Sequence, residues 1–149
     1  NFPLWFAAMA LLSGTGTVLN ARYVMRLGMR RIVASAYRMQ VVVSGVMAVL
    51  VFCDLLPEAL RFPAFFLWAV SVFFMAGVTF GNLNAMALQS MGHVAGMAAS
   101  VVAAVSTIGA VLIAAPVGLA YDGTARPIII ATLVCSSLAL WLMRRIHEA

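Results

Sequence analysis

Five long apolar stretches, separated by short charged or polar connections, constrain this chain more than any other feature of its sequence. Their approximate bounds are residues 2–21, 32–53, 64–88, 94–121 and 128–143. Each is close to the roughly 20 residues that a helix needs to cross a bilayer. None alternates between apolar and polar residues as a barrel strand does. The sequence therefore predicts an all-α membrane protein in which about five transmembrane helices form a single bundle.

The composition supports a membrane environment. Hydrophobic residues make up 65% of the 149 residues, charged residues make up 9%, and the mean hydropathy is +1.10. A soluble domain of this length has no core large enough to hide so much apolar surface. The net charge of +5 is compatible with a nucleic-acid partner, but the arginines lie near the ends of apolar stretches and are not interleaved with aromatic residues. We therefore expect a lipid bilayer, and not nucleic acid, as the partner.

The arginines are unevenly divided between the two sides of the expected bundle. Seven of the nine fall on the side of the first connection, the third connection and the C-terminus; these are Arg22, Arg26, Arg30, Arg31, Arg38, Arg144 and Arg145. The positive-inside rule predicts that this side is cytoplasmic and that Asn1 lies outside. An odd number of spans with an outside N-terminus leads us to expect further chain upstream.

Two stretches resemble a known family of transporters. Residues 20–31 have the sequence NARYVMRLGMRR, and residues 81–100 include GNLNAMALQ followed by GHVAGMAAS. The first resembles the cytoplasmic loop between helices eight and nine of the major facilitator superfamily, specifically of its bicyclomycin-resistance-type (Bcr/CflA) drug:proton antiporters. The second is similar to that family's junction of helices ten and eleven. On this resemblance the chain corresponds to helices 8–12, most of the C-terminal half of such a transporter.

The resemblance implies a multidrug efflux transporter of the bacterial inner (plasma) membrane, which exports small amphipathic compounds by proton-coupled alternating access. Its partners would be the missing N-terminal half, a drug-like small molecule and protons. The four acids lie outside the expected spans; they are Asp54, Glu58, Asp122 and Glu148. Because no carboxylate is expected at membrane depth, proton coupling would use residues outside this chain. The alternative is a non-transporting membrane module or truncated subunit that associates through small-residue helix faces.

Three groups of residues are candidates for function. A substrate cavity is assigned to Asn82, Asn84 and Thr15, because polar groups inside a span need a partner or a water-lined cavity. The cytoplasmic loop motif comprises Asn20, Arg22, Arg26, Gly28, Arg30 and Arg31. It is either a topology determinant or a latch between helix ends, and Gly28 is expected to provide a turn. A helix interface with the missing half is assigned to Gly14, Gly16, Gly96, Ala99 and Ala103, because small residues allow close helix approach.

The second and fifth spans are bulky and apolar, which suits lipid exposure. We expect Val42 and Ile129 to face lipid on this basis. The sequence contains no catalytic pair of nucleophile and base, no metal-ligand spacing and no phosphate-binding glycine loop, so we expect neither an enzyme nor a cofactor.

Overall fold

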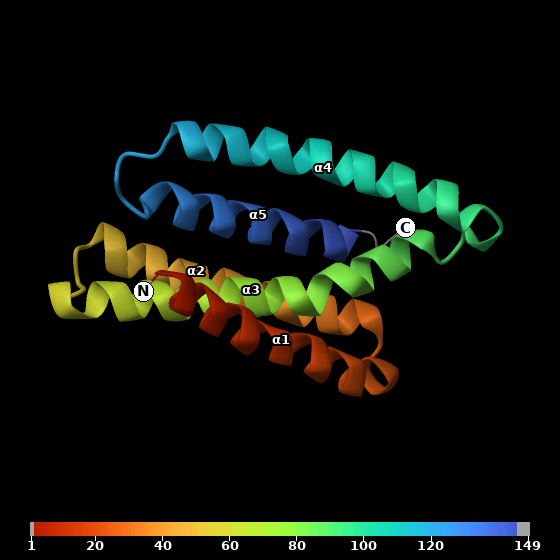
Figure 1. Cartoon of the computed structure of the whole chain (residues 1–149), viewed down its shortest axis with the longest axis horizontal. Coiled ribbons are helices and arrows are strands. Elements are labelled where there is room, and N and C mark those ends of the chain that lie inside the picture. The colour runs from red at the N-terminus through yellow and green to blue at the C-terminus, as the bar shows by residue number, and fades with distance from the viewer. Residues whose placement is uncertain (1, 146–149) are drawn as a thin grey trace.

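The computed structural model describes residues 2–145, which form five long α-helices joined by short connections (Figure 1). The helices are α1 (Phe2–Leu27), α2 (Met29–Phe52), α3 (Glu58–Leu88), α4 (Ala95–Leu119) and α5 (Arg126–Arg145), with the short 3-10 helix η1 (Gly92–Val94) before α4. No strand occurs among the described residues. All five long helices have the length and apolar composition needed to cross a membrane. The predicted class, an all-helical multi-pass membrane protein, is therefore confirmed.

α1, α2, α3 and α5 extend beyond the predicted spans at their charged ends, whereas α4 is slightly shorter than its predicted span. The basic segment that the sequence placed in a loop is helical. Arg22 and Arg26 lie in the last two turns of α1, and Arg30 and Arg31 lie in the first turn of α2. α3 begins at Glu58, ahead of the predicted start at residue 64. Arginine is a good helix former, and a helix satisfies backbone polar groups at the edge of the membrane, so charge alone does not end these helices.

Gly28 alone separates α1 from α2. Its φ of 81° lies in the left-handed region, which side chains other than that of glycine rarely adopt. The Gly28 N–H donates to the carbonyl of Val24 at 2.9 Å, so the glycine also closes the last turn of α1. The predicted turn is confirmed, and the connection around it is much shorter than the sequence indicated.

α1, α2, α3 and α5 pack together, whereas α4 has only sparse contacts, with α3 and α5 (Figure 1). α2 packs along both α5 and α3, and α1 packs along α3. α2 and α5 are antiparallel, as contacts at both ends show. At one end Arg30 Nη2 donates to the carbonyl of Met143 at 2.8 Å. At the other end the Arg126 guanidinium lies 5.5 Å from the centroid of the Phe52 ring.

The apolar core lies where α2, α3 and α5 meet, around Met47, Trp68 and Ile129. Ile129 is completely buried, so its predicted lipid exposure is wrong, whereas Val42 is 64% exposed as predicted. A run of bulky apolar residues covers all sides of a helix. It therefore cannot distinguish the side that packs against other helices from the side that meets lipid.

Candidate functional site

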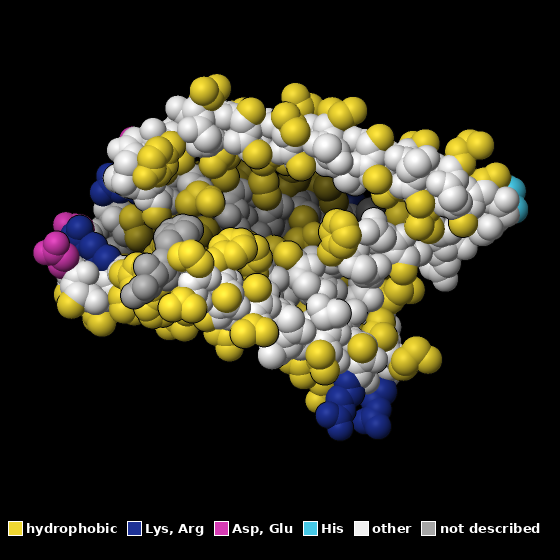
Figure 2. Space-filling model, viewed as in Figure 1, with side chains coloured by type: hydrophobic (Ala, Val, Ile, Leu, Met, Phe, Trp, Pro, Cys, Tyr) yellow, Lys and Arg dark blue, Asp and Glu magenta, His cyan; other side chains and the backbone are white. Residues whose placement is uncertain are grey.

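A groove of about 610 Å³ lies between α3 and the loosely packed helix α4. Figure 2 shows the hollow beneath α4, with mostly hydrophobic side chains around it. The α3 wall contains Phe80, Asn84 and Leu88. The α4 wall is made largely of small residues, including Ala99, Ala103, Ser106, Thr107, Ala110 and Ala114.

The groove exists because the face that α4 turns toward α3 is made of small side chains. Ala99, Ala103, Ala110 and Ala114 recur at the three- and four-residue multiples that place side chains on one face of a helix. Among the described residues of α4 only Ala98 is buried, so little apolar area holds this helix against its neighbours. The space that larger side chains would fill remains open.

The polar side chains of this groove have hydrogen-bonding capacity left for a ligand. The Thr107 hydroxyl donates to the carbonyl of Ala103, one turn earlier in α4, at 2.8 Å, and no further donor satisfies its oxygen among the described residues. Asn84 is half-buried and lies on the opposite wall. The arrangement offers apolar area with one amide and two hydroxyl groups, which is the character of a site for a small amphipathic molecule.

Of the three predicted cavity residues, only Asn84 lines this groove. Asn82 is instead buried between α1 and α3, where its Nδ2 donates to Asn20 Oδ1 at 2.6 Å and to the carbonyl of Val78 at 2.8 Å. Residues two apart on a helix point about 200° away from each other, so Asn82 and Asn84 necessarily face different surroundings. Thr15 is exposed on α1, and its hydroxyl donates to the carbonyl of Leu12 in the same helix.

The predicted interface residues also separate into two sets. Gly16 packs inside the chain, because a Cβ atom there would lie 3.0 Å from the backbone oxygen of Phe74 on α3. Gly14 and Gly96 face open space, with nothing within 4 Å of such an atom. Ala99 and Ala103 line the groove beneath α4. Gly16 therefore belongs to the contact between α1 and α3, whereas the other four residues have surface left for another part of a larger assembly.

A layer of buried polar residues between α2 and α3 was missed by the sequence reasoning. Gln40 and Ser44 are completely buried, and Trp68 is 4% exposed. The Ser44 hydroxyl oxygen accepts hydrogen bonds from Trp68 Nε1 at 3.1 Å and from Gln40 Nε2 at 3.0 Å. Gln40 Oε1 has no partner among the described residues. The signal was present in the four-residue spacing of glutamine and serine inside an otherwise apolar span, which places both on one helix face.

Charge separates the two ends of the bundle (Figure 2). The described acids lie at one end, where Asp54 and Arg61 form an ion pair of 2.9 Å, the only one within residues 2–145. At the same end the pKa of Asp122 is lowered, first by the hydrogen bond from the Thr124 hydroxyl and then by that from the Thr124 backbone N–H. The opposite end carries the arginines at the junction of α1 and α2 and at the end of α5.

Comparison of the chain with protein-family models, with curated proteins and with solved structures finds no match. Within residues 2–145 there is also no group of three or more side chains suited to hold a metal ion. The function must therefore be argued from the grooves and the charge distribution.

Proposed function

We propose that this chain is part of a multidrug efflux transporter of the bicyclomycin-resistance type, and that the groove between α3 and α4 forms part of its substrate pathway. The observation that carries the proposal is a large groove at membrane depth with Asn84, Ser106 and Thr107 among apolar walls. Polar side chains are costly next to lipid tails, and intramembrane polar groups commonly line substrate pathways. The mixed lining suits small amphipathic compounds.

The charge distribution supports an orientation for this transporter. With the arginine-rich end at the cytoplasmic face of a bacterial inner membrane, the N-terminus of the chain lies outside and the C-terminus inside. The described acids Asp54, Glu58 and Asp122 lie at the other end, outside the middle of the bundle. Proton coupling therefore falls to the half of the transporter that this chain does not contain. Alternating access then moves the two halves about a site near the midplane.

The test is dye export from an efflux-deficient bacterium that expresses the complete gene encoding this segment. Ala103→Leu fills the groove and Asn84→Leu removes its amide, so we expect both to lower export at least several-fold. Val42→Leu is the matched control, because Val42 is exposed and lies on α2, which does not line the groove between α3 and α4. Immunoblots of membranes verify equal expression. Export by the groove variants equal to that of the control, or no export by the unaltered gene, would overturn the proposal.

A non-transporting membrane module is the second candidate, and the sparse packing of α4 favours it. A helix that contacts only a few residues of α3 and α5 has most of its surface available for a partner helix. The two candidates differ in the dye assay. A module would associate with a membrane partner through α4 without any export, even when the complete gene is expressed.

A further inference from the structure

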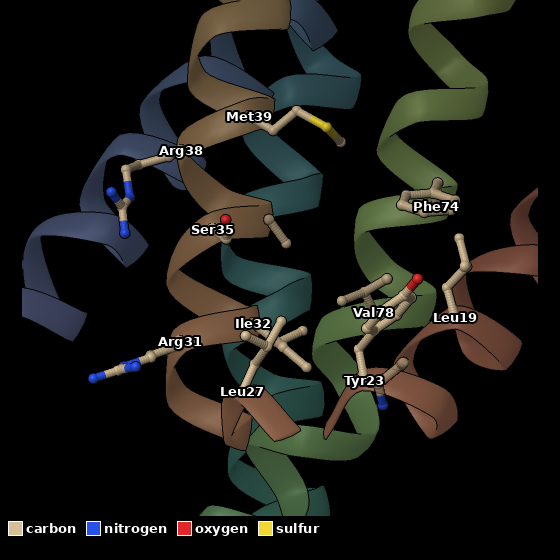
Figure 3. Close-up of a pocket in the computed structure, with 12 residues that line it drawn as sticks. Leu19, Tyr23, Leu27, Arg31, Ile32, Ser35, Arg38, Met39, Phe74 and Val78 are labelled. Atoms are coloured by element: carbon tan, nitrogen blue, oxygen red, sulfur yellow. The ribbon is translucent and has the colours of Figure 1, made fainter. Parts of the chain in front are cut away.

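A second groove, of about 540 Å³, lies at the arginine-rich end of the bundle between α1, α2 and α3. Figure 3 shows Leu19 and Tyr23 of α1 and Phe74 and Val78 of α3 on one side of it. α2 forms the other side. This groove shares no lining residue with the groove beneath α4, and two members of the loop motif, Asn20 and Arg31, line it.

The α2 side of the groove presents two arginines with a hydroxyl between them. Arg31, Ser35 and Arg38 are spaced by four and three residues, which places them on one face of the helix, and all three are exposed. The two arginines are separated by about 10 Å along the helix axis, at 1.5 Å per residue. Figure 3 shows both side chains leaving α2 on the side away from Leu19 and Phe74, at the outer edge of the groove, with the Arg38 guanidinium turned toward the end that carries Arg31.

Neither arginine has a partner within the part of the chain that the structure describes. Arg30, their neighbour, donates to the carbonyl of Met143, but no hydrogen bond or ion pair involves Arg31 or Arg38 among these residues. The described acids lie at the opposite end of the bundle. Within residues 2–145 no acidic side chain therefore lies beside these two guanidinium groups, and both can pair with an anionic group of the surroundings.

The surface beyond the arginines is apolar. Met39 lines the groove, and Val42, Val46 and Val49 continue the exposed face of α2 through its middle toward its far end, each more than half exposed. One continuous surface therefore offers positive charge at the edge of the membrane and hydrocarbon contact farther in. A phospholipid has the complementary order, with a phosphate at the surface and acyl chains below.

We propose that this groove binds one anionic phospholipid of the surrounding bilayer, such as phosphatidylglycerol. Arg31 and Arg38 hold the phosphate, with the Ser35 hydroxyl as a further donor, and an acyl chain lies against Leu27, Met39 and Val42. The two arginines attract the negative charge of the headgroup, and basic pockets between transmembrane helices are known sites for anionic headgroups. A zwitterionic lipid brings its own cation to the same place and binds less well.

The experiment measures lipid retention by native mass spectrometry on the purified full chain in a neutral detergent, titrated with phosphatidylglycerol or phosphatidylcholine. We expect one phosphatidylglycerol to be retained in preference to phosphatidylcholine. The double variant Arg31→Gln/Arg38→Gln should weaken that binding by about thirtyfold, from the usual contribution of two arginines at a membrane surface. Arg22→Gln/Arg26→Gln removes the same charge from α1 without touching the groove and should leave the binding within about threefold.

A third variant tests whether binding needs the open space of the groove in addition to the positive charge. Ser35→Trp blocks the space between the arginines, keeps both charges and alters an exposed position that the fold does not need. We expect it to weaken phosphatidylglycerol binding as well. Unchanged binding in this variant, or equal losses in the two arginine pairs, would overturn the proposal in favour of diffuse attraction by the basic end. Displacement of the lipid by millimolar inorganic phosphate would instead identify a free-anion site and would equally overturn it.

Discussion

The close approach of α1 and α3 at Gly16 allows a quantitative test with a matched control in the same helix. A Cβ atom at Gly16 would lie 3.0 Å from the Phe74 backbone oxygen and 3.1 and 3.3 Å from carbons of its ring. Ordinary contacts begin near 3.4 Å. The ring can rotate but the carbonyl cannot, so Gly16→Ala must push the two helices apart by a few tenths of an ångström. Gly14 is two residues away and has nothing within 4 Å of the same atom.

The expected magnitude follows from two contributions. Replacing glycine by alanine inside a helix stabilises it by up to about 1 kcal/mol, and this contribution is nearly the same at both positions. Overpacking a close interface costs about 1–3 kcal/mol, and only Gly16→Ala incurs that cost. The difference in the free energy of unfolding between the two variants therefore isolates the contact with Phe74. We expect Gly16→Ala to be less stable than Gly14→Ala by about 1–3 kcal/mol.

The assay is reversible unfolding of the purified chain in mixed micelles with increasing SDS, followed by circular dichroism. Gly14→Ala should unfold at the SDS fraction of the unaltered chain or above it, and Gly16→Ala clearly below it. Two variants that unfold within about 0.5 kcal/mol of each other would refute the reasoning, because surface-like substitutions differ by no more than that. The α1–α3 contact would then be looser than the distances indicate.

Three further predictions concern the asparagine pair, the bundle core and the turn before α5. Asn20→Ala and Asn82→Ala, combined in a double-mutant cycle, should couple by about 0.6 kcal/mol and by no more than about 1.7 kcal/mol, and additive losses would contradict the hydrogen bond between them. Ile129→Ala should cost about 2–5 kcal/mol in SDS unfolding and Val42→Ala less than about 0.5 kcal/mol, and equal losses would place Ile129 outside the core. Asp122 has a lowered pKa, so its carboxylate stabilises the turn at neutral pH and loses this effect as the pH falls through the folded-state pKa. Asp122→Asn should therefore be slightly less stable than the unaltered chain near pH 7, with the difference disappearing below about pH 4 in thermal unfolding followed by circular dichroism.

Much of the fold is predictable from the sequence because a bilayer leaves few choices for an apolar chain. Runs of about 20 apolar residues can only become helices there, so the number and order of the spans follow from hydropathy. Gly28 is likewise predictable, since a connection between two helices needs a residue that adopts a positive φ. The ends of the helices are less predictable, because arginines such as Arg22 and Arg30 extend a helix into the headgroup region as readily as they end it.

The candidate site is only partly predictable, because the direction of each side chain depends on which helices become neighbours. Asn82 and Asn84 look alike in sequence, yet one pairs with Asn20 and the other lines a groove. Gly14 and Gly16 likewise differ only in the face of α1 that each occupies. A hydropathy pattern identifies a span but not its rotation about its own axis. That rotation is fixed by contacts between helices, which a single sequence does not report.

The buried polar layer has a consequence for the order in which the helices enter the membrane. α2 carries Arg38, Gln40 and Ser44 well inside its length, so the isolated helix is a poor candidate for release into lipid. Its polar groups find Trp68 only after α3 has been synthesised. α4, the most apolar of the five helices, has no such requirement and can partition into lipid alone. We therefore expect α2 to stay beside the insertion machinery until α3 arrives, and α4 to enter the bilayer as an independent segment.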